Sequence, residues 1–293
     1  MRKTLFTRTI LVLFASIPIT MRRALFQAVL ILFYHVSQKH RLITLHNLTR
    51  AFPDKSLAEI TGIAKGVYRN LGTTLGEFFE IPSLTSQNMH HWVKFEGLEH
   101  YERARSRGKG ILFYTAHFGN WELAAACFGL QNIGVHIIYR ALDNPILENF
   151  VAWFRSYTGH RIVPKGGAFG KIIELLKNNE MIGVLIDQNV SWREGVFVDF
   201  FGRPASTTKR FAALSLQTGA AVVPVFIVRQ PTGRYKIVIN EEIETIQSTD
   251  HEGDLFHNTQ AYTAVIEDIV RRYPDQYFWL HQRWKTKMTQ IER

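Results

Sequence analysis

Cysteine is almost absent from this sequence of 293 residues, which contains Cys127 and no other. No disulfide can therefore form within the chain, and cysteine pairing places no constraint on the redox compartment. Cys127 stands among alanines in an apolar stretch, without an adjacent basic residue to lower the pKa of its thiol. We therefore expect it to be a buried packing residue and not a nucleophile. Histidines and cysteines are not spaced as in a zinc site, so we expect no metal and no cofactor.

Acidic residues are also scarce. The chain has 25 aspartates and glutamates against 35 lysines and arginines, which gives a formal net charge of +10 at pH 7. A positive chain favours an acidic partner, such as an anionic lipid, an acidic carrier protein or a nucleic acid. The basic residues are scattered, however, and the sequence has neither a zinc-finger spacing nor a motif for binding single strands. We therefore expect no nucleic acid as a partner.

The amino-terminal region lacks an uninterrupted apolar run of membrane-spanning length. Two shorter runs, at 10–19 and 24–36, are separated by Arg22 and Arg23. Each run is shorter than the ~20 residues that a straight spanning helix needs. A membrane anchor or an interfacial helical hairpin is the favoured interpretation, and a buried core helix and a cleaved signal peptide are the alternatives. We predict membrane-associated helices over residues 1–40 and one α/β domain over residues 41–293.

Apolar, strand-like runs alternate with helical stretches through most of the chain. Strands are expected near 110–116, 134–139, 182–187 and 222–228, and helices near 120–130, 144–158, 168–178 and 207–218. This alternation predicts an α/β fold with a mostly parallel sheet and helices on both faces. A further strand is expected at 235–240 and a last helix at 254–272. A capping-box pattern formed by Ser56 and Glu59 predicts a helix over 56–80.

One imidazole and one carboxylate stand at the end of the first of these strands. His117 and Glu122 are separated by four residues that include Gly119, where strand-forming residues give way to helix-forming ones. On a continuous helix the two side chains would point about 140° apart, but a turn at Gly119 lets them meet. A histidine that takes a proton from a hydroxyl needs an acceptor on its other ring nitrogen, and we expect Glu122 to be that acceptor. The spacing is also compatible with a polar strand end followed by an ordinary acid in the first helical turn.

Two other predicted strands also end in polar side chains. Arg140 comes directly after the second strand, and Asp187 and Gln188 stand at the end of the third. Ligands of open α/β sheets bind beyond the carboxyl ends of the strands, so we expect these residues to share one sheet edge with His117 and to position substrate there. A surface salt bridge for Arg140 and a loop cap for Asp187 and Gln188 are the alternatives.

The segment 116–122, Ala-His-Phe-Gly-Asn-Trp-Glu, resembles the His-x4-(Asp/Glu) signature of the glycerolipid acyltransferase superfamily. It is most similar to the branch that adds secondary, lauroyl- or myristoyl-type acyl chains to lipid A. Further segments resemble that branch in order, at 47–53, 139–140, 143–145, 187–189, 196–205, 218–225 and 277–285. The Phe-Pro-Glu-Gly-Thr phosphate-binding motif of phospholipid-making relatives is missing, which argues against a glycerol-3-phosphate acceptor.

The resemblance implies an O-acyltransferase that moves a fatty acyl chain from an acyl carrier protein thioester to a hydroxyl of a lipid A precursor. His117 is then the general base and Glu122 its orienting partner. Arg140, or backbone amides after Gly119, is expected to stabilise the oxyanion, with Arg155 as the competing arginine. Such enzymes act at the inner membrane, beside anionic lipid, with the active site facing the cytoplasm.

Further cationic residues are candidates for binding substrate. Lys209 and Arg210 follow a Ser-Thr-Thr segment that predicts a turn into a helix, where hydroxyl and cationic groups suit a phosphate. Near the carboxyl end, a strand-like alternation is expected to project His281, Arg283 and Lys285 to one side, towards a lipid headgroup or carrier. A plain helix cap and a solvated edge are the alternatives.

Other functions remain open from the residues alone. The main alternative is an acyltransferase that acts on another membrane lipid, such as a lysophospholipid or an amino-acid lipid. A hydrolase that uses the same pair on water is disfavoured, because the aromatic-rich chain offers a pocket that excludes water. A non-enzymatic membrane or nucleic-acid binding protein would not depend on His117. No oligomeric state is predicted.

Overall fold

The structure is a computed structural model that describes residue 9 and residues 13–139, 159–164 and 166–288. Arg140, Arg155 and the helix expected at 144–158 lie outside the described residues. The strands of the main sheet are β1 (Val93–Glu96), β2 (Ile111–Thr115), β3 (His136–Tyr139), β4 (Arg161–Pro164), β5 (Met181–Leu185), β8 (Ala221–Arg229) and β9 (Tyr235–Ile239).

These strands lie in the order β1-β9-β8-β2-β5-β3-β4, and each neighbouring pair is parallel except β8 with β9. The predicted α/β fold with a mostly parallel sheet is thus confirmed. β1 and β4 were not predicted, because each is a run of only four residues that includes charged side chains, Lys94 and Glu96 in β1 and Arg161 in β4.

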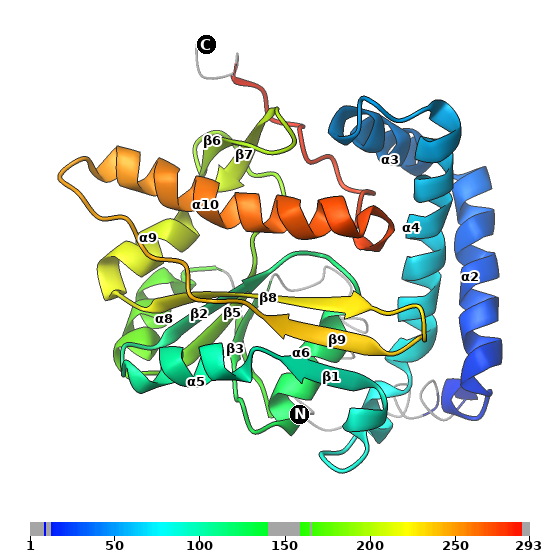
Figure 1. Cartoon of the computed structure of the whole chain (residues 1–293), viewed down its shortest axis with the longest axis horizontal. Coiled ribbons are helices and arrows are strands. Elements are labelled where there is room, and N and C mark those ends of the chain that lie inside the picture. Colours follow the sequence, from blue (N-terminus) through cyan, green and yellow to red (C-terminus); the bar gives the residue numbers. More distant parts are fainter. Residues whose placement is uncertain (1–8, 10–12, 140–158, 165, 289–293) are drawn as a thin grey trace.

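Helices cover both faces of the sheet. They are α2 (Ile19–Val36), α3 (Gln38–Ala51), α4 (Leu57–Phe78), α5 (Leu98–Ser106), α6 (Trp121–Leu130), α8 (Ala168–Lys177), α9 (Arg210–Thr218) and α10 (His251–Arg272). One core cluster joins the sheet to α8, α9 and α10, and the other joins it to α5 and α6. Figure 1 shows α10 above the sheet and α5 below it. The capping box of Ser56 and Glu59 starts α4 as predicted.

The packing of the central strand β2 explains why its sequence is apolar. Leu112 and Tyr114 enter the core cluster beneath α8, α9 and α10, whereas Ile111 and Phe113 enter the cluster with α5 and α6. Both faces of β2 are therefore buried, as expected for a parallel strand covered by helices on each side. The strand carries the chain from the core to the sheet edge at Thr115, just before His117.

A small hairpin replaces the predicted turn into a helix. β6 (Gly195–Asp199) and β7 (Pro204–Thr208) pair antiparallel, and α9 begins only at Arg210. Ser206 and Thr207 are buried within β7. The prediction of a helix-capping turn before Lys209 is therefore wrong, since strand pairing uses the segment whose hydroxyl groups suggested a cap.

The carboxyl-terminal segment also differs from the prediction. Tyr277 makes an isolated bridge with Phe118, but residues 278–287 form turns and bends instead of a strand. Arg283 is buried while Lys285 is exposed. The cations of this segment therefore do not share one side, and the strand predicted from their alternation is not formed.

The amino-terminal helix α2 packs closely against α4. A methyl group on Gly72 would lie 2.6 Å from the Cα of Gln27, so a larger side chain would separate the two helices. Charged groups support the same contact: Arg23 pairs with Glu77 at 2.8 Å, and the buried Arg22 pairs with Glu80. The charges between the two apolar runs thus face α4.

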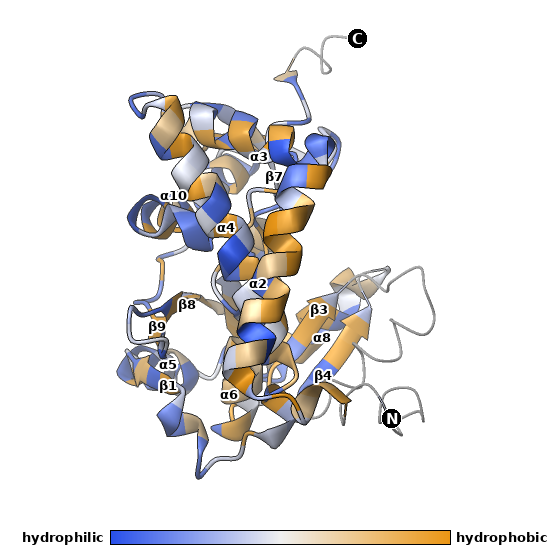
Figure 2. Cartoon of the chain, turned by 90° about the vertical axis from the view of Figure 1, so that its right-hand side faces the viewer, coloured by the Kyte–Doolittle hydropathy of each residue, from blue (hydrophilic) through white to orange (hydrophobic). Residues whose placement is uncertain are grey.

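The opposite side of α2 is apolar and exposed (Figure 2). Its exposed residues recur at helical spacing along one stripe: Met21, Leu25, Val29, Leu32 and Val36. The helix is long and apolar enough to cross a membrane by length and composition, and most of it is not buried. One face of α2 is therefore charged and packed against α4, whereas the opposite face is apolar and exposed.

Candidate active site

The carboxyl ends of β2 and β5 bring together two side chains that lie 70 residues apart. Thr115 is paired with Leu185 in the parallel ladder, so the residues two positions further on are neighbours. His117 Nδ1 lies 2.8 Å from Asp187 Oδ1, and the backbone N–H of His117 donates to Asp187 Oδ2 at 3.1 Å. The prediction that Asp187 shares one sheet edge with His117 is confirmed.

Burial and hydrogen bonding set the charge of Asp187. Burial alone would raise the pKa of this fully buried carboxyl group, but the charge of His117 and its two hydrogen bonds outweigh burial and hold the pKa well below its usual range. An ionised carboxylate accepts a hydrogen bond from Nδ1–H, which leaves Nε2 of the imidazole able to accept a proton. Gln188 Nε2 lies 3.4 Å from His117 Nε2, at the exposed side of the ring.

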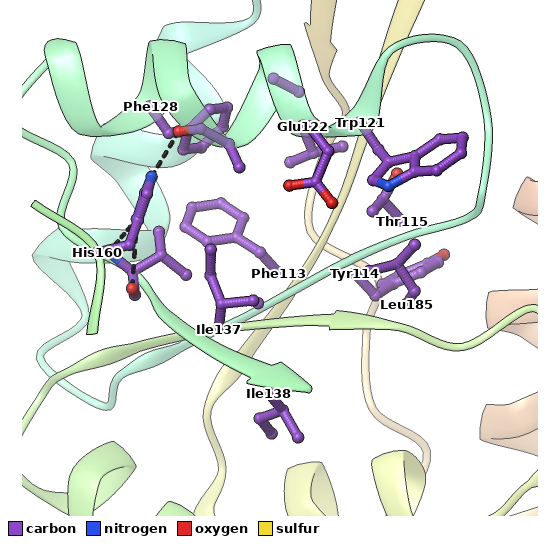
Figure 3. A pocket seen from close by; sticks show the side chains of 15 residues that line it. Phe113, Tyr114, Thr115, Trp121, Glu122, Phe128, Ile137, Ile138, His160 and Leu185 are labelled. Carbon is purple, nitrogen blue, oxygen red and sulfur yellow. Dashed lines mark hydrogen bonds between the residues drawn. The ribbon is translucent and has the colours of Figure 1, made fainter. Parts of the chain in front are cut away.

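The role expected for Glu122 needs a correction. The acceptor on His117 Nδ1 is Asp187, and no hydrogen bond between described residues joins His117 to Glu122. Because α6 begins at Trp121, Glu122 lies in the first helical turn and its carboxylate is directed into a pocket (Figure 3). Trp121, the residue before it, packs edge-on against the His117 ring with 5.4 Å between ring centroids. The catalytic role of Glu122 stays a prediction.

The turn between β2 and α6 is fixed by close contacts. Gly119 has φ +60°, and a Cβ there would lie 2.0 Å from the carbonyl oxygen of Ile227. Its N–H donates to the carbonyl of Gln276 at 2.8 Å. Asn120 caps α6 by accepting from the N–H of Leu123 at 3.1 Å. The turn at Gly119 is as predicted, and the structure adds that a glycine is required for its size as well as its conformation.

A buried carboxylate supports this turn from behind. Glu77 of α4 accepts a hydrogen bond from Asn120 Nδ2 at 2.9 Å and pairs with Arg229 at 2.9 Å and Arg23 at 2.8 Å. The hydroxyl of Tyr235 also donates to it. This buried network links α2, α4 and β8 to the residue that starts α6.

An apolar pocket opens beside Glu122, between α6 and strands β2, β3 and β5 (Figure 3). It encloses about 730 Å³ of space, part of which is open to solvent. Its walls are mainly aliphatic and aromatic, with Phe113, Phe128, Ile137, Ile138 and Leu185 among them. His160 closes one side, where it hydrogen-bonds to the carbonyl of Ala125 at 2.5 Å and burial lowers its pKa. A hydrocarbon chain fits such a lining.

Comparison with known proteins identifies the family. The sequence model of the family described as bacterial lipid A biosynthesis acyltransferase matches residues 4–286. The chain belongs to this family. It is 29% identical to a lipid A biosynthesis lauroyltransferase of Escherichia coli (strain K12) over 85% of the chain and 80% of the relative. It is 26% identical to a lipid A biosynthesis palmitoleoyltransferase of the same strain, again over 85% and 80%.

A more distant relative acts on a different lipid. The chain is 23% identical to a phosphatidylinositol mannoside acyltransferase of Mycobacterium tuberculosis (strain CDC 1551 / Oshkosh), over 82% of the chain and 78% of the relative. All three relatives are acyltransferases by name, so the enzyme class is common to them while the acceptor is not. The chain is therefore an acyltransferase.

Within this lipid A biosynthesis acyltransferase family member, the remaining candidate residues are dispersed. Lys209 and Arg210 pair with Glu252 at 3.5 Å and Glu194 at 3.0 Å on the surface. Arg140 and Arg155, the two candidates for stabilising the oxyanion, lie outside the described residues. The candidate active-site edge is therefore formed by His117, Asp187, Gln188 and the first turn of α6.

Arg283 is part of the interior of this acyltransferase. Its guanidinium donates to the carbonyl of Ser206 at 3.1 Å and to the hydroxyl of Thr207 at 2.5 Å, and it stacks over the ring of Phe200. The expectation that it projects outward to a substrate is corrected, because its contacts hold the β6–β7 hairpin to the carboxyl-terminal segment. Cys127 is buried, as predicted, and burial raises the pKa of its thiol to about 12.

Sequence reasoning missed the pairing of Asp187 with His117 and the support given by Glu77. Asp187 was placed at the correct edge, but only the adjacency of β2 and β5 makes it the partner of His117. Glu77 carried a weaker signal, an acid near the end of the helix predicted at 56–80.

Proposed function

We propose that the protein transfers a fatty acyl chain from an acyl carrier protein thioester to a hydroxyl of a lipid A precursor, in late lipid A acylation. The observation that carries the proposal is the His117–Asp187 pair beside an apolar pocket lined by Glu122. The pair supplies a base with a defined protonation site, and the pocket has the lining that an acyl chain requires. No cofactor is needed, because the thioester is itself the activated donor.

In the proposed reaction, Nε2 of His117 removes the proton of the acceptor hydroxyl as its oxygen attacks the thioester carbonyl. Asp187 stabilises the imidazolium that forms and keeps Nδ1 protonated. A carbon–oxygen bond forms, the carbon–sulfur bond breaks, and the imidazolium returns its proton to the departing thiolate. Glu122, at the pocket beside Trp121, is proposed to orient the acceptor hydroxyl.

The tetrahedral intermediate places negative charge on the former carbonyl oxygen. Backbone N–H groups in the first turn of α6 are proposed to stabilise this charge, since the amino end of a helix favours an anion. The N–H of Leu123 is already occupied by Asn120, so the amides of Trp121 and Glu122 are the proposed donors. Arg140 is proposed as an additional donor.

Two further features, the net charge of the chain and the exposed stripe of α2, support the proposed partners and the proposed membrane location. A net charge of +10 favours an acidic acyl carrier protein and anionic lipid as partners. The exposed stripe of α2 is proposed to lie in the inner membrane or its interface, with the active site on the cytoplasmic side.

The decisive experiment combines the purified full chain with a lipid A precursor and acyl carrier protein loaded with a fatty acid, and identifies the product by mass spectrometry. We expect a mass increase of one acyl chain, which is lost in His117→Ala. The same reaction with coenzyme A as the carrier, over a range of salt, tests the donor: a preference for coenzyme A with equal salt response would remove the carrier protein.

Acylation of another membrane lipid is the second candidate. It is favoured by the similarity to a phosphatidylinositol mannoside acyltransferase, whose named acceptor is not lipid A. Offering both classes of acceptor to the enzyme, with product masses as the readout, decides between them.

A further inference from the structure

The carboxyl-terminal segment runs beside α3 (Figure 1). A second pocket lies between them, lined by residues of both and away from the candidate active site. It encloses about 820 Å³ of space, including space open to solvent. Its lining consists of Leu42, Ile43, His46, Asn47, Arg50, Gln282, Trp284, Lys285 and Lys287. None of these residues belongs to the site described above.

The polar part of this lining is positive. Arg50, Lys285 and Lys287 contribute three cations, and among the residues that the structure describes no aspartate or glutamate lines the pocket. Within the described part of the chain, neither Arg50 nor Lys285 forms an ion pair, whereas Lys209 and Arg210 do. Cations that converge on one hollow without a lining carboxylate produce a potential that attracts an anion.

His46, which also lines this pocket, lies among positive charges. Burial lowers the pKa of His46, and the positive charges of Arg50, Lys287 and Arg203 lower it further. Three cations from three parts of the chain thus act on one imidazole at this pocket. An anion that entered would offset their mutual repulsion.

Hydrogen bonds hold the two walls of the pocket together. Asn47 of α3 is buried, and its Nδ2 donates to the carbonyls of Trp279 at 2.9 Å and His281 at 2.7 Å. On the other wall, Thr286 donates to the carbonyl of Val190 at 2.8 Å. The cations of the pocket are therefore carried on backbone whose position does not depend on a ligand.

The apolar part of the pocket indicates what kind of anion it takes. Leu42 is 53% exposed, and it follows by six residues Val36, which is 74% exposed at the end of the stripe on α2. Figure 2 shows the hydrophobic face of α2 leading towards α3. A phosphorylated lipid would place its phosphate group against these cations and its hydrocarbon chains against this apolar surface. Free phosphate would contact the cations alone.

We propose that this pocket binds the phosphate group of a lipid. Two lipids carry that chemistry in this setting, the phosphorylated acceptor of the reaction and an anionic phospholipid of the membrane. Binding of the phosphorylated acceptor rests on the proposed function, whereas binding of an anionic phospholipid does not. Guanidinium and ammonium groups donate several charge-assisted hydrogen bonds to a phosphate monoester, which has three acceptor oxygens.

The test uses the full chain in two assays, with Arg50→Gln/Lys285→Gln as the variant. The matched control is Lys171→Gln/Lys177→Gln, which removes two exposed cations from α8 and changes the net charge equally. Vesicle flotation compares binding to phosphatidylcholine alone with binding to phosphatidylcholine that contains phosphatidic acid. Steady-state kinetics compare a phosphorylated acceptor with the same acceptor after removal of its phosphate.

If the phosphate comes from a membrane lipid, the variant loses the preference for phosphatidic acid by about ten-fold per contact, while the control keeps it. If it comes from the acceptor, the KM for the phosphorylated acceptor rises by a similar factor, while kcat and the KM for the dephosphorylated acceptor stay unchanged. Either outcome supports the proposal.

Three outcomes overturn it: no change in either assay, an equal loss in the control, or a change confined to the KM for the acyl carrier donor. Flotation needs no acyl transfer, so it tests the pocket even if the proposed reaction fails. If transfer succeeds and both phosphate effects are absent, the pocket proposal alone is wrong.

Discussion

Replacing Asp187 by asparagine tests the His117–Asp187 pair of the proposed active site. Asparagine keeps the size of the side chain and an oxygen that can accept from His117, so the turn after β2 should persist. What it removes is the charge. Asp187 is fully buried and places one oxygen 2.8 Å from Nδ1 and the other 3.1 Å from the backbone nitrogen of His117. The variant therefore isolates the electrostatic contribution of the carboxylate.

The magnitude follows from the separation of the charges. Opposite charges about 4 Å apart attract by about 4 kcal/mol at an effective dielectric constant of about 20. This attraction is absent while His117 is neutral and develops as His117 becomes an imidazolium. Losing the attraction therefore raises the activation barrier without weakening substrate binding. We expect kcat to fall by about 10³-fold, within the range of about 10²–10⁴ for general-base catalysis. KM should change little, because Asp187 does not line the apolar pocket.

The assay is the initial rate of acyl transfer to a detergent-dispersed acceptor, measured with Asp187→Asn, His117→Ala and the double variant. Residues that act as one unit are not additive, so the double variant should be no slower than His117→Ala. Thermal unfolding of Asp187→Asn checks that the fold is kept. Glu122→Gln serves as the comparison, since it alters the acid that the sequence pointed to.

Two results would refute this reasoning. An Asp187→Asn enzyme with wild-type kcat would show that the carboxylate does not assist the base. A double variant far slower than either single variant would show that His117 and Asp187 act independently. If Glu122→Gln lost kcat while Asp187→Asn did not, Glu122 would be the orienting group after all.

Four further outcomes are expected. Gly119→Ala should destabilise the fold by about 1–3 kcal/mol, because its methyl group would collide with the carbonyl of Ile227. Denaturant unfolding measures this loss, and a variant of wild-type stability would show that the turn relaxes. Glu77→Ala removes a buried carboxylate from the partly buried Arg23 and Arg229 and should cost about 3 kcal/mol, the low end of the range for breaking a buried ion pair; an unchanged midpoint would contradict the network. The pKa of Asp187 is lowered in the folded state, so its stabilising contribution is complete above the ordinary carboxyl pKa and is lost as pH falls through the folded value. Wild type and Asp187→Asn should therefore converge in stability in acid, and a gap that widened there would reverse the assigned sign. Val29→Asp, on the exposed stripe of α2, should reduce vesicle flotation without changing kcat on a dispersed acceptor, and undiminished flotation would remove the stripe from the membrane contact.

The sequence by itself determined the elements with strong local patterns. The continuous apolar run at 111–115 predicted β2, and Gly119 marked the turn after it because glycine readily adopts a positive φ, which is +60° here. The capping box at Ser56 and Glu59 starts α4 through hydrogen bonds that span three residues. These features depend on neighbours along the chain, and a local pattern predicts them correctly.

Only the tertiary structure decided which residues meet. Asp187 faces His117 because β5 lies next to β2, and strand order depends on the packing of whole layers, which no local pattern contains. The same reason explains Arg283, whose burial against Ser206 and Thr207 requires the β6–β7 hairpin to lie beside the carboxyl-terminal segment. A polar residue in the sequence can serve a site or the interior, and its partners across the fold determine which.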